Sequence, residues 1–401
     1  MREQVRICII KRLGIDRGLS LTKIDGGVMN LLKSIMAFLN ARFHVTIFTT
    51  NEDNGPNKEV LGNVEIHRLN IPSQEYLEGM ERDYWDGVEF GTKLDDYIPF
   101  KKGTFDCYHT HHWSSALFPV SATEKLRPWH VHTPHFLACE KAKMLGIKLP
   151  KEVREGEKRI LKSSDRIIAL SQHEKKAIQE EYGIEDRFIK VIPNGVSEVF
   201  FRREFRWKVS SIEATPLRLI TIARIAWQKG LDLLIRAIAR LRDLKLPVCT
   251  TIVGGSYRES NYERELYDLI TKLKVTKFIK FMGNLSRQEV ARELSKSALY
   301  IQPSRYESQG IAIAEAMATG LPVVATQLTA IGEFVKNGVN GYLVCVEGYE
   351  ALSNAIASLR QQPEIVKVMS KNNRAVAKRF TWKKTQEETI KCFNDGIKEQ
   401  C

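Results

Sequence analysis

Two glutamates, Glu307 and Glu315, stand eight positions apart in a segment whose residue types suit nucleotide chemistry. The residues Ser-Gln-Gly at 308–310 are typical of a helix start, where free backbone N–H groups can bind a diphosphate. Carboxylates can accept hydrogen bonds from both hydroxyls of a ribose. We therefore expect Glu315 to reach a ribose and Glu307 to face the group attached to the diphosphate. Alone, the same spacing fits two glutamates without a ligand equally well.

A second pair of charges, Arg224 and Lys229, stands five positions apart between an expected strand and an expected helix. An arginine can bind a phosphate through two parallel hydrogen bonds, and a lysine can bind it as a point charge. Both side chains could therefore meet one diphosphate. The alternative is two solvated surface charges.

The elements that must position these side chains are strands alternating with helices. Residues 299–303 form an apolar run that ends at a proline, which predicts a short buried strand. Helical spacing from Ile311 and a glycine at Gly320 predict a helix, and 321–325 predict the next strand. Strand–glycine units ending at Gly254 and near Gly283 repeat this pattern. The alternation predicts an α/β fold with parallel sheets.

Histidines concentrate in the first half of the chain, where six of the nine lie within 27 residues. His109 and His111 end one expected strand, and His135 follows another. Three interpretations stay open for them: a metal site, hydrogen-bonded core residues, or a sugar-binding residue at the carboxyl end of a strand. Their spacing matches no common zinc pattern, so we expect no metal.

Other candidates in the first half depend on weaker signals. Gly26 and Gly27 at an expected helix start would let the backbone approach a phosphate or sugar, or they form an ordinary glycine turn. Lys141 and Arg159 are basic residues that could face a phosphorylated acceptor. A solvated helix face explains Arg159 equally well.

Composition bounds the class of protein. A chain of 401 residues is long enough for two domains, and no apolar run approaches the ~20 residues that span a bilayer. Residues 2–10 are interpreted as a first strand rather than a signal peptide. The net charge of +13 comes without a nucleic-acid-binding signature. Seven scattered cysteines without paired spacing favour a reducing cytoplasm over disulfides or zinc.

Longer motifs resemble a known family. Three motifs resemble the two-glutamate block of retaining glycosyltransferases of family 4. They are Ser-x-Tyr-Glu-x-x-Gly at 304–310, Glu-Ala-Met-Ala-x-Gly-x-Pro-Val-Val-Ala at 315–325 and Asn-Gly at 337–338. Arg224 and Lys229 match the family's diphosphate clamp. The histidine wording at 109–113 and 132–137 resembles the sucrose-phosphate-synthase-like branch and its mycothiol-pathway relatives. Gln309 departs from the family, which usually has an apolar residue there. The resemblance is specific mainly in residues 217–345.

The resemblance implies a GT-B fold, with two Rossmann-like domains whose parallel sheets face each other across a cleft. Residues 1–196 would bind the acceptor, with a C-terminal helix from about 382 to 401 packing back on them. Residues 197–216 would be a linker, and 217–381 would bind the nucleotide-sugar donor. UDP is the donor nucleotide most frequent in the family, and Glc or GlcNAc the sugar. The acceptor would be small and polar or phosphorylated, such as a sugar phosphate, an inositol phosphate or an aminocyclitol.

The implied reaction is retaining sugar transfer without a metal or cofactor, because the chain contains no Asp-x-Asp triplet. Catalytic roles would fall to His135, Glu307, Arg224 and Lys229. The acceptor would lie near His109, His111, Lys141 and Arg159. The donor-binding residues would be Gly26, Gly27, Arg224, Lys229, Gly254, Gly283, Leu285, Glu307, Ser308, Gln309, Gly310, Ile311 and Glu315.

Three alternatives remain. A membrane-surface enzyme with a lipid-linked acceptor would bind vesicles, which the basic stretch 141–176 permits but does not favour. A sugar-nucleotide epimerase on the same scaffold would need paired carboxylates in the first domain, and none is convincingly placed. A catalytically inactive binding module would lack the four charged residues of the clamp and the two-glutamate block. A homodimer stays open, and no nucleic-acid partner is expected.

Overall fold

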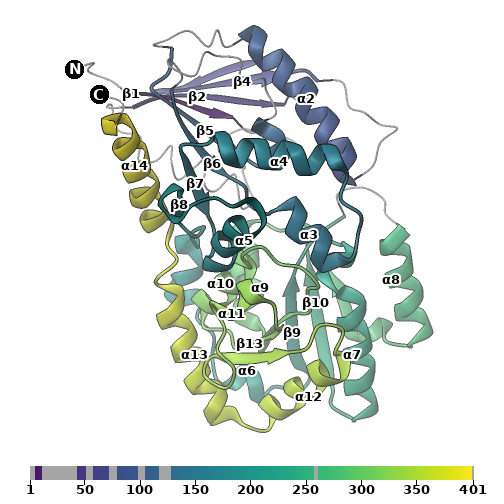
Figure 1. Ribbon diagram of the computed structural model, residues 1–401. Helices are drawn as coiled ribbons and strands as arrows, with labels where there is room; N and C mark the ends of the chain where they lie inside the picture. The colour runs from purple at the N-terminus through teal and green to yellow at the C-terminus, as the bar shows by residue number, and fades with distance from the viewer. Residues whose placement is uncertain are drawn as a thin grey trace. The chain divides into compact units, whose positions relative to one another are not determined.

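The computed structural model describes residues 5–10, 43–50, 57–71, 79–97, 104–116, 128–256 and 261–399. The chain divides into two compact units (Figure 1). The first contains Met1–Asn194 and Trp382–Cys401, and the second contains Gly195–Thr381. Gly26 and Gly27 lie outside the described residues.

The first unit is built on an eight-stranded sheet, in which the described strands follow the order β3-β4-β2-β1-β5-β6-β7-β8. All neighbours are parallel except β3 and β4 at the edge. The strands are β1 (Val5–Ile10), β2 (Phe43–Thr50), β3 (Lys58–Leu61), β4 (Val64–Leu69), β5 (Cys107–His111), β6 (Trp129–Thr133), β7 (Arg166–Ala169) and β8 (Ile189–Val191). The described helices are α2 (Gly79–Tyr97), α3 (Ala138–Leu145), α4 (Lys151–Ser163), α5 (Gln172–Tyr182) and α14 (Trp382–Glu399).

Both faces of this sheet are buried, as its apolar strands require. In β1, Ile7 and Ile9 join one cluster with Phe393 of α14, whereas Cys8 and Ile10 join another with Phe90 of α2. Alternate residues of a strand point to opposite faces, so helices must cover both sides. The C-terminal helix α14 packs against β6 and runs beside the strands of this unit (Figure 1).

The second unit contains a six-stranded parallel sheet of order β11-β10-β9-β12-β13-β14. Its strands are β9 (Leu217–Ile222), β10 (Val248–Val253), β11 (Ile279–Phe281), β12 (Leu299–Gln302), β13 (Val323–Thr326) and β14 (Gly341–Val344). Its helices are α6 (Ser210–Glu213), α7 (Leu231–Asp243), α8 (Asn261–Lys272), α9 (Arg287–Lys296), α10 (Ile311–Thr319), α11 (Thr329–Gly332), α12 (Tyr349–Arg360) and α13 (Pro363–Ala377). The α/β class with parallel sheets expected from the sequence is confirmed.

Residues 197–216, expected as a linker, pack into the second unit instead. Phe200 and Ile212 are fully buried in its core. The indole Nε1 of Trp207 donates a hydrogen bond to the carbonyl of Ala298 at 3.1 Å. The sequence did not indicate these three buried residues, because Phe200 lies in a run of only three apolar residues and Trp207 and Ile212 each stand alone among polar ones.

The topology determines where a ligand would bind. In each sheet the strand order reverses at one point, between β1 and β5 in the first unit and between β9 and β12 in the second. Open α/β sheets bind ligands at such a point, outside the carboxyl ends of the strands. In the second unit the loops there carry Lys229 and Glu307, and in the first unit β5 carries His109 and His111.

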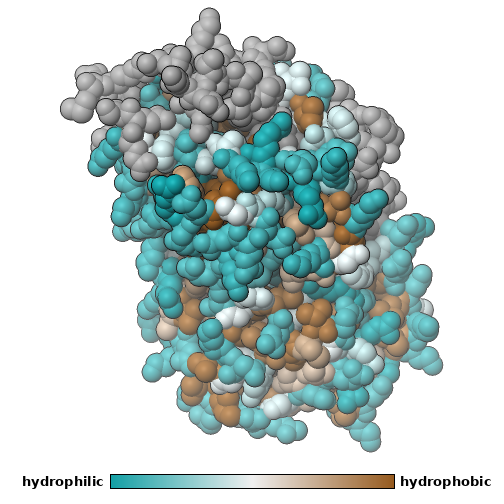
Figure 2. All heavy atoms as spheres, in the orientation of Figure 1, coloured by the Kyte–Doolittle hydropathy of each residue, from teal (hydrophilic) through white to brown (hydrophobic). Residues whose placement is uncertain are grey.

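The visible surface is mainly hydrophilic, with apolar residues scattered in small groups (Figure 2). No helix among the described residues is long and apolar enough to cross a bilayer.

Candidate active site

Two loops of the second unit meet at its switch point. The first connects β9 to α7 and carries Arg224 and Lys229, and the second connects β12 to α10 and carries Glu307. Gly230 has a left-handed φ of 64°, and a Cβ there would lie 1.9 Å from the carbonyl oxygen of Pro303. Only glycine permits this approach of the two backbones. The sequence therefore builds the site by bringing the start of α7 into direct contact with the loop that follows β12.

Lys229 and Glu307 form an ion pair in this site. The Lys229 Nζ lies 2.8 Å from Glu307 Oε2, and the side chains are 17% and 12% exposed. Gln302 Nε2 and Ser304 Oγ each donate to the same carboxylate oxygen at 3.3 Å. A lysine ammonium has three donors, so Lys229 can keep this partner and still bind a phosphate oxygen. The structure thus brings together two residues that stand 78 positions apart in the chain.

Arg224 lies on the same loop but is exposed, and its side chain has no hydrogen bond or ion pair within the described part of the chain. Its backbone neighbours are fixed: Ala223 and Ile225 donate to the carbonyls of Val253 and Gly255 at 2.9 and 3.1 Å. The Arg224 guanidinium therefore projects from a held backbone, and its donors are available to an anionic ligand.

Gly254 and Gly283 lie beside this backbone at the ends of β10 and β11. The Gly254 amide donates to the Gly283 carbonyl at 2.8 Å. Gly254 has φ 125°, and a Cβ there would lie 2.2 Å from the Ala223 carbonyl oxygen. Leu285 follows, half-buried. These positions form a backbone-lined edge next to the Arg224 loop.

The helix α10 begins directly after Glu307. Gly310 is its N-cap, with φ 83°, and Gly320 is its left-handed C-cap, as the sequence predicts. Ser308 and Ile311 are half-buried, and Gln309 is buried. The first amides of an α-helix have no intrahelical acceptor. Amide donors therefore lie beside the carboxylate of Glu307.

Glu315 is held differently from Glu307. It is 2% exposed, and its carboxylate accepts a hydrogen bond from the guanidinium of Arg287 in α9. Burial raises the pKa of Glu315, and Arg287 opposes that shift. Sequence reasoning missed Arg287. A signal was present, because Ser286 and Glu289 form a capping box that makes Arg287 the first residue of its helix.

In the first unit, the structure brings His111 and His135 together. His111 Nδ1 lies 3.0 Å from His135 Nε2. His135 is half-buried and has a left-handed φ of 66°, an uncommon conformation for a residue with a side chain. Such backbone geometry clusters at functional sites. His111 itself is fully buried behind this contact.

His109 occupies a core position, which corrects the expectation of a direct acceptor contact. It is fully buried, and its ring packs edge-on against Phe393 with centroids 5.4 Å apart. His109 Nε2 lies 2.9 Å from Thr133 Oγ1. Burial, with a smaller contribution from His130, lowers the pKa of His109 to about 3. A neutral core histidine explains this residue.

The two basic candidates of the first unit lie on the two helices that follow His135 in the chain. Lys141 is in α3, with its Nζ 5.0 Å from the centre of the Phe136 ring. Arg159 is on the exposed face of α4. Between them, the buried Glu157 accepts from the first amides of α3, at Ala138 and Cys139. Glu157 therefore fixes the helix that follows His135.

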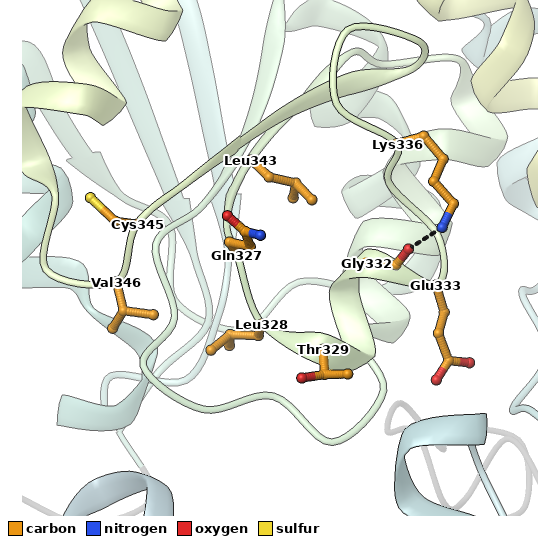
Figure 3. A pocket seen from close by; sticks show the side chains of 9 residues that line it. All are labelled: Gln327, Leu328, Thr329, Gly332, Glu333, Lys336, Leu343, Cys345 and Val346. Atoms are coloured by element: carbon orange, nitrogen blue, oxygen red, sulfur yellow. Dashed lines mark hydrogen bonds between the residues drawn. The ribbon is translucent and has the colours of Figure 1, made fainter.

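A groove of about 710 Å³ opens at the carboxyl ends of β13 and β14 (Figure 3). Its lining residues are Gln327, Leu328, Thr329, Gly332, Glu333, Lys336, Leu343, Cys345 and Val346. Lys336 reaches across one wall and donates to the Gly332 carbonyl at 2.8 Å. The groove begins one residue after Thr326, whose hydroxyl donates to the Ser304 carbonyl. The groove therefore opens at the end of β13, the strand next to the one that leads into the Glu307 loop.

No group of three His, Cys, Asp or Glu side chains within the described ranges is placed to hold a metal ion.

Comparison with known proteins agrees with this architecture. Residues 202–376 match the family described as glycosyl transferases group 1, and residues 25–199 match the one described as glycosyltransferase family 4. Relatives include two proteins named D-inositol 3-phosphate glycosyltransferase. The one from Saccharomonospora viridis is 27% identical over 388 residues, covering 93% of this chain and 90% of its own. The one from Rhodococcus erythropolis is 26% identical over 382 residues, covering 92% and 86%.

Solved structures share the fold. The sucrose-phosphate synthase of Thermosynechococcus elongatus has a TM-score of 0.81 at 21% identity, covering 98% of this chain and 99% of its own. Anabaena HepE in complex with UDP-glucose has a TM-score of 0.74 at 18% identity, covering 98% and 100%. With a family match on each half of the sequence, the chain belongs to the family 4 glycosyltransferases of the GT-B fold.

Proposed function

We propose that this glycosyltransferase moves a hexosyl group, Glc or GlcNAc, from UDP to a hydroxyl of a small polar or phosphorylated acceptor, with retention at the anomeric carbon. The observation that carries the proposal is the Lys229–Glu307 pair at the switch point of the second unit. An inositol phosphate is the acceptor to try first, because relatives of similar length carry that name.

The donor would bind along the carboxyl edge of the second sheet. Its diphosphate would lie between Arg224, Lys229 and the first amides of α10, and its base along Gly254, Gly283 and Leu285. The ribose hydroxyls would meet the Glu315–Arg287 pair after a small local adjustment, since Glu315 is buried. Ser308, Gln309, Gly310 and Ile311 would frame the diphosphate from the helix start.

The chemistry would then rest on charge and position. The bond from the anomeric carbon to the diphosphate breaks as a bond from the acceptor oxygen to that carbon forms on the same face. The acceptor proton passes to the leaving phosphate oxygen. Arg224 and Lys229 would stabilise the negative charge that grows on the diphosphate, which is how fixed cations accelerate such steps. Glu307 would hold sugar hydroxyls beside the reacting carbon.

In the first unit, His135 would orient the sugar, and His111 would fix which ring nitrogen of His135 carries the proton. Lys141 and Arg159 would attract a phosphorylated acceptor. Gly26 and Gly27 would line the donor side by close backbone approach. His109 has no role in direct contact, because it is buried.

The test is a transfer assay with UDP-glucose and UDP-GlcNAc against inositol phosphates, read by UDP release and by NMR of the product's anomeric proton. We expect an α-linked product, matching the α-linked donor, and loss of turnover in Lys229→Ala. Lys296→Ala is the matched control, because Lys296 also forms an ion pair, with Glu293 at 2.6 Å, but on the outer surface of α9. A β-linked product would contradict retention.

A lipid-linked acceptor is a second candidate, favoured by one observation. Met144 and Ile147, 40% and 45% exposed, stand beside the exposed Lys148 and Lys151. Apolar side chains flanked by lysines bind anionic membrane surfaces. Co-sedimentation with vesicles containing phosphatidylglycerol tests this candidate, and Met144→Ser with Ile147→Ser should abolish it. Equal sedimentation of the unchanged and doubly substituted proteins would remove it.

A further inference from the structure

Arg305 lies inside the segment between Ser304 and Glu307, yet the proposed chemistry gives it no role. Its side chain is only 7% exposed. A guanidinium has five N–H donors in a rigid plane. All five have an acceptor: two go to Asp232, two to Glu347 and one to the carbonyl of Trp227. A saturated guanidinium has no donor left for a substrate, which separates Arg305 from Arg224.

Three of these five bonds go to residues on either side of Lys229. Arg305 Nη1 and Nη2 bind the two oxygens of Asp232 at 2.7 and 2.8 Å, and Asp232 stands three residues after Lys229. Nη1 also donates to the carbonyl of Trp227, two residues before Lys229, at 2.9 Å. The Trp227 ring covers the guanidinium at 4.6 Å. Arg305 thus binds the Lys229 loop on both sides of the lysine.

The backbone repeats this connection. The amides of Arg305 and Tyr306 both donate to the carbonyl of Gln228, at 2.9 and 3.3 Å. Gln228 is the residue immediately before Lys229. Glu307 comes directly after Tyr306, and its carboxylate meets the Lys229 ammonium. The two functional loops are therefore joined by side chain and backbone at the same place.

The outer partners of this cluster are also held. The Tyr262 hydroxyl donates to Asp232 Oδ1 at 2.7 Å. Burial opposes ionisation of Asp232, but the hydrogen bonds from Arg305 and Tyr262 outweigh it and lower the pKa of the Asp232 carboxyl. Glu347 has a left-handed φ of 66°. Each of its two carboxylate oxygens accepts one hydrogen bond from Arg305.

We propose that Arg305 is a positioning residue, which holds the Lys229 loop and the Glu307 loop at a fixed separation so that the lysine meets the donor diphosphate without reorganisation. This inference rests on the proposed function, since it takes the diphosphate to bind at Lys229. Arg305 acts through Lys229 and Glu307 and does not touch the donor. Substitution of Arg305 therefore weakens donor binding only while Lys229 is present.

A double-mutant cycle tests this dependence, with UDP as the probe and isothermal titration calorimetry as the measurement. The proteins are the unchanged chain, Arg305→Met, Lys229→Met and the double variant. We expect Arg305→Met to weaken UDP binding at least tenfold, and to change it less than twofold when Lys229 is already Met. Independent, additive losses would overturn the positioning role, because they would mean that Arg305 acts elsewhere. Unchanged affinity in Arg305→Met would overturn it as well.

Two further proteins keep the test decisive. Arg360→Met is the matched control, because Arg360 also binds two backbone carbonyls of the second unit, at Ile212 and Glu213, away from both loops. It should leave UDP affinity within twofold. If Arg305→Met fails to fold, Glu347→Ala replaces it, since the Glu347 side chain is 59% exposed. We expect a severalfold loss of UDP affinity there, and no loss would overturn the proposal.

UDP binding by the unchanged protein distinguishes a failure of the proposed function from a failure of the positioning role. If the unchanged, folded protein binds neither UDP nor GDP nor ADP, then the donor site itself is wrong and the role of Arg305 falls with it. If the unchanged protein binds UDP and the cycle is additive, only the positioning role is lost.

Discussion

At the residue scale, two glutamates of one short segment have different surroundings. Glu307 forms an ion pair with Lys229 and accepts hydrogen bonds from two neutral side chains, Gln302 and Ser304. Glu315 is buried against Arg287. Residue types and spacing were enough to single out both glutamates, Arg224 and Lys229 as candidates. They could not predict Arg287 or the Asp232–Arg305 pair, because those partners lie 28 and 73 positions away and meet only in the folded sheet.

Histidine spacing in the first unit also did not predict which histidine packs in the core and which one contacts His135. The sequence motif gives His109 and His111 equivalent positions. In the fold, the two side chains have different partners. Alternation in β5 turns both rings to one face, where His109 packs on Phe393 and His111 reaches His135. The contact of His109 with Phe393 depends on α14, which comes from the far end of the chain.

His109 should make the stability of the first unit depend on pH. Its folded pKa of about 3 lies below the ordinary value of 6.5. Between these values the unfolded chain binds a proton that the folded chain excludes, so stability is full above pH 6.5 and falls as pH drops. From pH 7 to pH 5 the loss is about 2 kcal/mol for one such histidine. Urea unfolding at pH 7 and pH 5 measures the free energy of unfolding at each pH. The difference between the two values should be smaller by about 2 kcal/mol in His109→Asn than in the unchanged protein.

His132 contributes in the same direction, because burial also lowers its pKa well below the ordinary value. The pH effect should therefore shrink in His109→Asn without disappearing. An undiminished effect in the variant would show that His109 does not stay neutral in the fold.

At the element scale, the helix after Glu307 shows what local sequence can predict. Its start after Gly310 and its end at Gly320 follow from the glycines and the helical spacing, and the structure confirms both. The approach of the two loops could not be predicted, because it depends on contact between Gly230 at the start of α7 and Pro303 after β12, which lie 73 positions apart in the chain.

Gly230→Ala tests that approach. The new Cβ would lie 1.9 Å from the Pro303 carbonyl oxygen at a φ of 64°. We expect a loss of about 3 kcal/mol or more in the free energy of unfolding, from overpacking and from the left-handed backbone together. Gly338→Ala is the matched control in the same unit, since its φ is 75° but no atom lies within 4 Å.

The control should lose about 1 kcal/mol, the conformational cost alone. Chemical denaturation of the second unit measures both variants. Equal losses would mean that the two loops do not depend on close contact at Gly230.

At the scale of the whole molecule, the chain completes its first unit with its last helix. It leaves that unit after Asn194 and returns at Trp382. The sequence predicted two α/β units of this kind. It did not predict that residues 197–216 would belong to the core of the second unit, since their anchors Phe200, Trp207 and Ile212 follow no regular period.

Phe393→Ala tests the dependence of the first unit on α14. Phe393 is fully buried in a cluster with Ile7, Ile9 and Trp129. Truncation of such a side chain costs about 3–5 kcal/mol. We expect the unfolding transition of the first unit to lose that much. Lys391→Ala, on the exposed face of the same helix, should change it by less than about 0.5 kcal/mol. A loss confined to the second unit would contradict the assignment of α14.

The first measurement to make is thermal unfolding of the purified protein with UDP, GDP and ADP, beside Lys229→Ala. A nucleotide present at ~100 times its dissociation constant stabilises the folded state by about 2.7 kcal/mol, enough to raise the melting temperature visibly. We predict that UDP stabilises the unchanged protein. The effect should be lost in Lys229→Ala, because this variant lacks the ammonium group that would bind the diphosphate. A well-folded protein that no nucleoside diphosphate stabilises would contradict a donor site at Lys229 and Glu307.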